Sequence, residues 1–139
     1  MILDLQRAAH AVLIRLATEL DGLSMLSPFE LNALGNLAAA GSATTPSALG
    51  AAIGCRPAAV PSILERLEMR GLVTREAGTG EHEELVALTA DGVAAAAEVS
   101  AAMRELERRA FAGLSTDATG QATAALRALT EAATLGTAR

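Results

Sequence analysis

Residues 56–75 read RPAAVPSILERLEMRGLVTR, and this stretch decides the fold. Apolar side chains recur after Pro57 at spacings of three and four, which predicts a helix with one buried face. The predicted buried residues are Val60, Ile63 or Leu64, and Leu67. Gly71 is placed to end this helix, and residues 72–74 then read as a strand. A helix followed at once by a strand is therefore the centre of the predicted structure.

The sequence on both sides extends this centre into a winged helix-turn-helix. Upstream, Thr45-Pro46 has the cap and the proline of a helix start, and Gly54 ends that short helix before a tight turn. Downstream, a loop at residues 78–80 leads to a second strand at residues 85–88, which predicts a two-stranded wing. The commonest use of a winged helix-turn-helix is to place one helix in the DNA major groove.

The second helix of the pair is the predicted recognition helix, and DNA would meet its exposed side. The exposed residues are predicted to be Ala58, Pro61, Ser62, Glu65 and Met69. A proline inside a helix removes a backbone hydrogen bond and costs up to about 3 kcal/mol. We therefore expect Pro61 to make this helix kinked or late-starting, and not regular from Pro57 to Met69.

Helices are also predicted before and after the winged segment. A capping box at Ser27-Pro28-Phe29-Glu30 starts one helix, Thr89 caps a long one, and Ser115 caps the last. Three helices carry apolar stripes with few partners in the chain, which indicates a helical dimer interface. The stripes are Ile2, Leu5, Ala9, Val12, Leu16 and Leu20; Val93, Ala96, Val99, Met103, Leu106 and Ala110; and Ala122, Ala125 or Leu126, Leu129 and Ala133.

The predicted fold class is mainly α: a winged helix-turn-helix with a two-stranded β wing, flanked by N- and C-terminal helices that form a dimerisation region. We place an N-terminal dimerisation helix at residues 1–22, the winged helix-turn-helix DNA-binding region at residues 23–89, and the C-terminal dimerisation helices at residues 90–139. Half of the chain is apolar, so a core can form, but Phe29 and Phe111 are its only aromatic residues.

The composition argues against several other classes of protein. No apolar run approaches the roughly 18 residues of a membrane span, and the start MILDLQRAAH lacks the features of a signal peptide. We expect a cytoplasmic protein with no membrane partner. One cysteine and two well-separated histidines, His10 and His82, offer no metal-ligand spacing. No catalytic motif is present, so we expect no enzymatic activity, no metal and no cofactor.

The segments LGAAIG (49–54), VPSILERLEMRGLVTR (60–75) and VALTADG (86–92) resemble the MarR family of bacterial transcription regulators. The similarity in helix order extends over nearly the whole chain. The resemblance implies a homodimer whose first, fifth and sixth helices interlock and whose two winged helices bind a pseudo-palindromic DNA operator. It also implies release of DNA by a small aromatic or anionic effector bound between the dimerisation and DNA-binding regions.

The chain departs from the family where the family contacts DNA. The recognition helix has Pro61 and Ser62 where the family commonly has serine or threonine followed by arginine. The wing has Gly80-Glu81-His82-Glu83-Glu84 where the family normally has an arginine. Residues 28–89 hold four arginines against seven glutamates, so the module is net acidic. Because neutralising phosphates supplies much of DNA affinity, this balance is expected to weaken binding.

The predicted DNA-binding residues are Arg56, Ala58, Pro61, Ser62, Arg75 and His82. Arg56 starts the recognition segment and could reach a phosphate or a guanine edge, or it is a solvated arginine in a turn. Arg75 at the base of the wing is a phosphate-contact candidate. Flanking carboxylates would favour the charged form of His82, which allows a pH-dependent wing, although a plain surface histidine is the alternative.

Two further residues near the recognition helix are predicted to be structural. Arg66 is interpreted as a partner of Glu65, Glu68 or a neighbouring carbonyl rather than as a DNA contact. Cys55, in the turn before the recognition helix, is interpreted as a small apolar filler rather than a redox sensor.

The sequence therefore predicts a MarR-like dimeric regulator, a ligand-responsive repressor at its operator. The alternative is a degenerate winged-helix protein with weak or no DNA binding that acts through protein partners or as a small-ligand binder.

Overall fold

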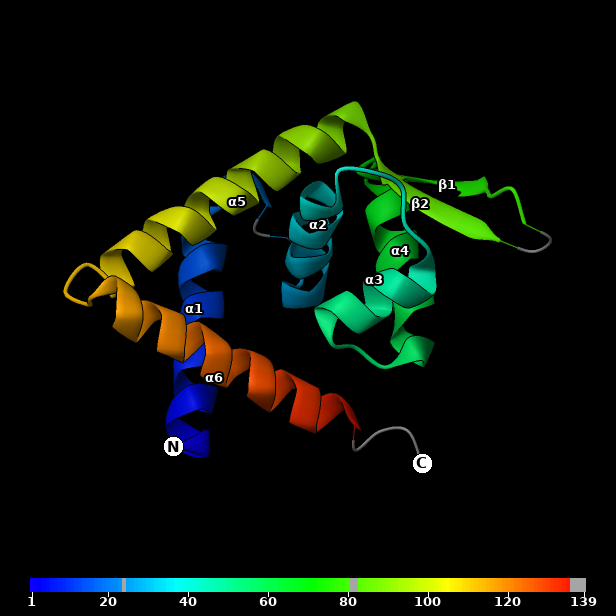
Figure 1. Ribbon diagram of the computed structural model, residues 1–139. Coiled ribbons are helices and arrows are strands. Elements are labelled where there is room, and N and C mark those ends of the chain that lie inside the picture. Colours follow the sequence, from blue (N-terminus) through cyan, green and yellow to red (C-terminus); the bar gives the residue numbers. More distant parts are fainter. Residues whose placement is uncertain (24, 81–82, 136–139) are drawn as a thin grey trace. The chain divides into compact units, whose positions relative to one another are not determined.

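The computed structural model describes residues 1–23, 25–80 and 83–135. In these ranges the chain is mainly helical, with one two-stranded antiparallel sheet (Figure 1), which confirms the predicted fold class. It divides into two compact units, Met1–Arg104 and Glu105–Arg139.

The elements follow one another in the predicted order. The helices of the first unit are α1 (Ile2–Glu19), α2 (Pro28–Ala40), α3 (Pro46–Ile53), α4 (Val60–Met69) and most of α5 (Ala90–Ala110), with strands β1 (Val73–Ala77) and β2 (Glu84–Leu88). Two short 3₁₀ turns, η1 (Asp21–Leu23) and η2 (Pro57–Ala59), precede α2 and α4, and the second unit contains α6 (Thr116–Leu135).

The predicted helix starts and ends are confirmed. Ser27 and Glu30 form a complete capping box at α2, and the Thr45 hydroxyl accepts a hydrogen bond from the Ala48 amide at the start of α3. Gly41 and Gly54 end these helices with φ values of 65° and 67°, in the left-handed region that favours glycine. Local sequence therefore fixes the length of both helices.

The recognition helix starts late, as predicted. Pro57–Ala59 forms the 3₁₀ turn η2, and the α-helix begins only at Val60. This start places Pro61 in the first turn of α4, where backbone N–H groups have no partner within the helix. The proline consequently removes no hydrogen bond from the helix interior.

The core of the first unit is formed by α2, α3, α4, both strands, α5 and the end of α1. Apart from Glu30, its most deeply buried side chains are aliphatic: Leu16, Leu31, Ala33, Leu34, Leu37, Leu49, Ile63, Leu64, Leu67, Val73, Val86, Ala96 and Val99. The apolar stripe of α1 is buried only at its end, because Leu16 and Leu20 are covered while Ile2 and Val12 are 61% and 41% exposed. In α6, Leu126 and Leu129 are also exposed.

The second strand of the wing is hydrogen-bonded to the segment that precedes α3. β1 and β2 are antiparallel, with Val73 opposite Leu88 and Ala77 opposite Glu84. Thr44, just before α3, exchanges two backbone hydrogen bonds with Val86, at 3.0 and 2.8 Å, and so adds a bridge that the sequence did not predict. These bonds tie the second strand of the wing to the start of α3.

Thr89 joins the wing, the recognition helix and α5. Its hydroxyl donates to the Gly71 carbonyl and accepts from the Gly92 amide at 2.9 Å, and its own amide donates to the Leu72 carbonyl at 3.1 Å. A Cβ atom at Gly92 would lie 1.9 Å from the Leu72 oxygen. Thr89 and Gly92 of the VALTADG segment are thus explained by a close approach of two backbone segments.

No single helix among the described residues is long and apolar enough to cross a membrane, and the one pair that has this length and apolarity, α3 with Pro57–Met69, is bent by 114°.

Candidate nucleic-acid interface

The recognition helix α4 has two chemically different sides. Val60, Ile63, Leu64 and Leu67 are at most 5% exposed, which confirms the predicted buried face. The opposite side exposes Pro61, Ser62, Glu65 and Met69, also as predicted, and Ala58 is exposed in η2. The Ser62 hydroxyl donates to the Ala59 carbonyl at 3.0 Å, so only its oxygen lone pairs remain for an external donor.

Arg66 is a structural residue, but its partner is not one of those predicted. Its Nε lies 2.7 Å from a carboxylate oxygen of Glu30, which is 2% exposed. Glu65 and Glu68 do not bind Arg66 because side chains one or two residues apart on a helix do not face each other. Glu30 was identified from its capping box alone, and only the packing of α2 against α4 places its carboxylate at Arg66.

Two more arginines of the module are held within the protein. Arg70 donates from Nη2 to the Met25 carbonyl at 3.1 Å. Arg75 donates from Nε to Glu84 on β2 at 2.5 Å, and its Nη1 lies 3.9 Å from Glu68 on α4. The predicted phosphate contact at the base of the wing is therefore already paired with two carboxylates.

The Arg75–Glu84 pair changes the proton affinity of both groups. The hydrogen bond from Arg75 lowers the pKa of the Glu84 carboxyl, and the same bond raises the pKa of the Arg75 guanidinium. Both groups therefore carry their charges at neutral pH, and an incoming phosphate would compete with Glu84 for Arg75.

Arg56 differs from the other arginines of the winged helix. It is exposed immediately before η2, and its side chain makes no hydrogen bond or ion pair with any residue in the described ranges, while its backbone carbonyl accepts from the Ala59 amide at 2.9 Å. The remaining predicted contact, His82, lies outside the described residues, as does Glu81. Of the four arginines in residues 28–89, Arg56 is accordingly the one whose side chain needs no internal bond to be broken before it meets a phosphate.

The hairpin loop of the wing is closed by Glu83. Its backbone carbonyl accepts from the Gly78 amide at 2.7 Å, and its carboxylate accepts from the Gly80 amide at 3.1 Å. A Cβ at Gly78 would lie 2.7 Å from this carboxylate. Glu83, one of the acidic residues of the wing, therefore stabilises the hairpin loop.

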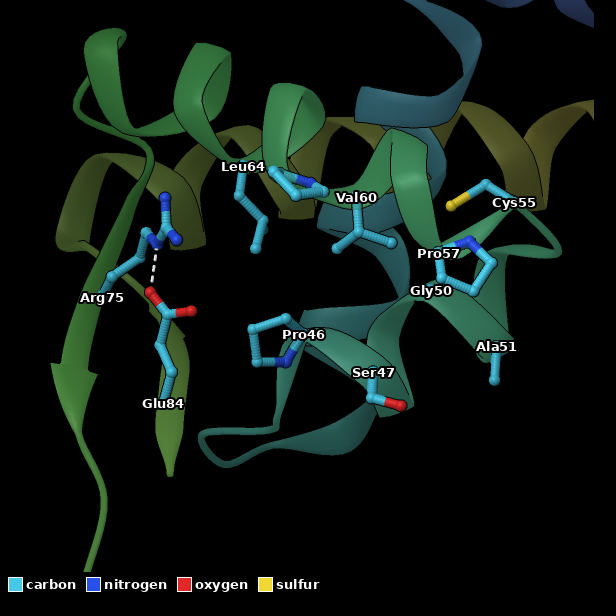
Figure 2. Close-up of a pocket in the computed structure, with 11 residues that line it drawn as sticks. Pro46, Ser47, Gly50, Ala51, Cys55, Pro57, Val60, Leu64, Arg75 and Glu84 are labelled. Atoms are coloured by element: carbon cyan, nitrogen blue, oxygen red, sulfur yellow. Dashed lines mark hydrogen bonds and ion pairs between the residues drawn. The ribbon is translucent and has the colours of Figure 1, made fainter. Parts of the chain in front are cut away.

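A cavity of about 370 Å³ lies among α3, the start of α4 and the wing. Figure 2 shows Pro46, Val60 and Leu64 facing the same space, with the Arg75–Glu84 pair at one edge and Cys55 on another side. The remaining lining residues are Ser47, Gly50, Ala51, Pro57 and Pro61. The sequence did not predict this cavity, because it depends on how α3, α4 and β2 pack.

Metal-binding geometry is not found in this part of the chain. Within the described ranges, no group of three or more His, Cys, Asp or Glu side chains is placed to hold a metal ion. Cys55 is a half-buried free thiol.

The fold is shared with solved transcription regulators. A probable transcriptional regulator from Pseudomonas aeruginosa is 27% identical, with 93% of this chain and 96% of that chain covered and a TM-score of 0.77. A MarR-family regulator from Silicibacter pomeroyi is 25% identical, with 90% and 84% covered and a TM-score of 0.75. CouR from Rhodococcus jostii RHA1, bound to p-coumaroyl-CoA, is 21% identical, with 91% and 88% covered and a TM-score of 0.77.

No protein-family model and no curated protein matches this sequence. The structural comparisons place the chain in the class of winged-helix transcription regulators. Within that class it has the fold of the MarR family, and the resemblance inferred from its sequence is confirmed. The similar proteins are regulators and not enzymes, in agreement with the prediction that this chain has no enzymatic activity.

Proposed function

We propose that the protein binds double-stranded DNA as a homodimer and represses transcription from a pseudo-palindromic operator. The observation that carries this proposal is Arg56, whose unpaired side-chain cation lies beside an exposed recognition segment on a helix with a buried aliphatic face. Ala58, Pro61 and Ser62 follow it and would approach the groove, while Arg75 would bind phosphate after leaving Glu84. His82 is retained as a proposed contact. Such a protein acts in the cytoplasm, where the DNA is.

The proposed dimer is supported by apolar side chains that the monomer leaves uncovered. On α1, Ile2, Leu3, Val12, Leu13 and Ile14 are between 37% and 65% exposed. Burying apolar area contributes about 25 cal/mol per Å², so a partner helix that covered these side chains would stabilise both copies. In the proposed organisation, residues 1–22 and 90–139 supply the dimer contacts, and residues 23–89 bind DNA.

Response to a ligand is the third part of the proposal. CouR, one of the similar structures, is bound to p-coumaroyl-CoA. By analogy, a small aromatic or anionic effector would lower the affinity of this protein for its operator.

The test is binding to DNA from upstream of the protein's own coding region, measured by fluorescence anisotropy at 50 mM salt. The proposal expects saturable binding, competition by the same duplex but not by an equal mass of unrelated DNA, and a dimer by light scattering. Absence of binding at this salt concentration, where phosphate neutralisation contributes most, would reject DNA binding.

A second function is favoured by the charges of the module. Residues 28–89 hold four arginines and seven glutamates, and Arg66, Arg70 and Arg75 have internal partners. A winged helix that works through protein partners or holds a small ligand needs no phosphate contacts. A dimer that binds none of the DNA duplexes tested at 50 mM salt would support this alternative.

A further inference from the structure

The cavity among α3, α4 and the wing shares Pro61 and Arg75 with the DNA contacts proposed above, but those contacts give the cavity itself no role. We propose that it binds a small neutral compound, an aromatic or alicyclic ring with one hydroxyl or carbonyl group, and that this compound and DNA compete for the protein. Its effect on DNA rests on the proposed function, but its binding does not. The site lies inside the winged helix, whereas the family resemblance places an effector between the winged helix and the dimerisation region.

The cavity has the size and the rigidity of a ligand site. Its volume of about 370 Å³ lies within the range of small-molecule pockets, roughly 300 to 1,000 Å³. Three prolines, Pro46, Pro57 and Pro61, form part of its wall. A proline ring has fixed φ and almost no side-chain entropy to lose, so a ligand would order little of this wall on binding.

The cavity cannot close by a simple approach of its two helices. Where α3 meets α4, a Cβ atom at Gly50 would lie 2.6 Å from the Val60 Cγ2 atom. The helices are already in close contact at this point, and only the absence of a side chain at Gly50 permits it. The space beside this contact is therefore a fixed feature of the packing.

The charges at the edge favour a neutral ligand. Arg75 and Glu84 face each other there and are joined by a hydrogen bond (Figure 2). A carboxylate in the cavity would meet the negative charge of Glu84 as well as the positive charge of Arg75, and an ammonium group would meet the reverse. A hydroxyl or carbonyl oxygen can accept from the remaining guanidinium N–H groups without disturbing the pair.

Competition with DNA follows from shared residues. Pro57 and Pro61 line the cavity and belong to the exposed recognition segment, and Arg75 is the phosphate candidate of the wing. A compound that occupies this space would hold Arg75 beside Glu84 and fill the surface between recognition segment and wing. By linkage, DNA would weaken binding of the compound by the same factor.

The experiment compares three probes of nearly the same shape: benzyl alcohol, benzoate and benzylamine. They are titrated into ¹⁵N- and methyl-labelled protein and followed by NMR. The proposal expects saturable shifts for benzyl alcohol at the amides around the cavity, at least fivefold tighter binding than for the two charged probes, and ring-to-methyl NOEs at Val60 and Leu64. NOEs from other methyl groups only, or tightest binding by a charged probe, would overturn it.

Variants locate the site independently. Pro46→Phe adds a ring at the cavity wall, whereas Ala48→Phe adds the same ring two residues along α3 at an exposed position that does not line the cavity. Binding of benzyl alcohol should fall at least fivefold in Pro46→Phe and stay unchanged in Ala48→Phe. Equal binding by both variants would contradict the site. If Pro46→Phe does not fold, the NOEs in the unmodified protein decide the question.

A DNA measurement separates this inference from the proposed function. Benzyl alcohol should weaken DNA binding of the unmodified protein and of Ala48→Phe, but not of Pro46→Phe. If no variant binds DNA, the proposed function fails while the NMR titration still decides whether the cavity binds its probe. If DNA binds and saturating benzyl alcohol leaves its affinity unchanged, the competition is wrong.

Discussion

The buried and the exposed side of the recognition helix differ in what determines their residues. Inside, Val60, Ile63, Leu64 and Leu67 pack as an aliphatic core requires, and none is more than 5% exposed. Outside, the helix presents Pro61 and Ser62, and Arg66 turns back to Glu30 rather than outward. This contrast indicates that the buried side of the helix determines the winged-helix fold, whereas its exposed side determines the affinity for DNA. Substitutions on each side should therefore affect different measurements.

The largest expected effect is at the inner junction of the wing and α5. Gly92→Ala would place Cβ 1.9 Å from the Leu72 carbonyl oxygen, so backbone must move. We expect a loss of about 3 kcal/mol in the free energy of unfolding, measured by urea titration. Gly120→Ala in α6 is the control, because nothing lies within 4 Å of its Cβ position. Helix propensity there predicts a gain of up to about 1 kcal/mol. Equal effects would refute the close approach.

A smaller loss of stability is expected from Glu30→Ala. The substitution removes the carboxylate half of the capping box of α2 and leaves Arg66 without its partner, at a cost of about 2 kcal/mol. Glu65→Ala removes the same charge from the exposed side and should change unfolding by less than about 0.5 kcal/mol. If both variants unfold alike, Glu30 does not link α2 to the recognition helix.

Arg56→Ala tests the outer side directly. We expect DNA affinity to fall about tenfold at 50 mM salt, because each subunit loses the unpaired arginine of its recognition segment, while urea unfolding stays unchanged. Arg104→Ala makes the same change in net charge at an exposed position of α5 and should alter DNA affinity by less than about twofold. Similar losses in both variants would mean that only overall charge matters.

The sequence alone could predict the inner side because its signals are local. Each signal depends on residues that are close together in the sequence. These signals are the caps at Ser27 and Thr45, the glycines that end α2 and α3, and the spacing of apolar residues in α4. Even the effect of Pro61 was predictable, since a proline is tolerated in a first turn and not further along.

The pairing of the arginines could not be predicted, because it depends on packing and strand register. Arg75 lies opposite Val86 and reaches diagonally to Glu84, which only the register reveals. Glu30 and Arg66 are 36 positions apart in the numbering and meet through the contact of α2 with α4. The sequence showed that the module is net acidic. It did not show which arginine side chain is free of internal partners and available to bind phosphate.

A substitution at Glu84 tests whether pairing with this carboxylate limits the contribution of Arg75 to DNA affinity. Glu84→Gln should release Arg75 for phosphate, whereas Glu76→Gln removes an equal charge from exposed β1 without touching that pair. We expect Glu84→Gln to raise DNA affinity about threefold more than Glu76→Gln, by anisotropy at the same salt concentration. Equal gains would show that Glu84 acts only through its charge.

The smallest effect concerns an ion-pair cluster on α5, outside the winged helix. Hydrogen bonds from Arg108 and Arg109 lower the pKa of Glu105 to about 2, from an ordinary value of 4.5. Because the folded value is the lower one, the stabilisation is present above about pH 4.5 and is lost as the pH falls towards 2. A ¹³C titration of the carboxyl should show this midpoint. A midpoint near 4.5 would mean that the cluster is not formed in solution.

The central claim is that DNA binding depends on a small number of available arginines, and the salt dependence of affinity tests it most directly. With Arg56 and a displaceable Arg75 in each subunit of a dimer, log affinity against log salt should have a slope of about −3.6 at 0.9 per neutralised phosphate. A slope between about −2 and −4 between 50 and 200 mM salt would support the claim. A slope steeper than about −6, or no binding at 50 mM salt, would contradict it.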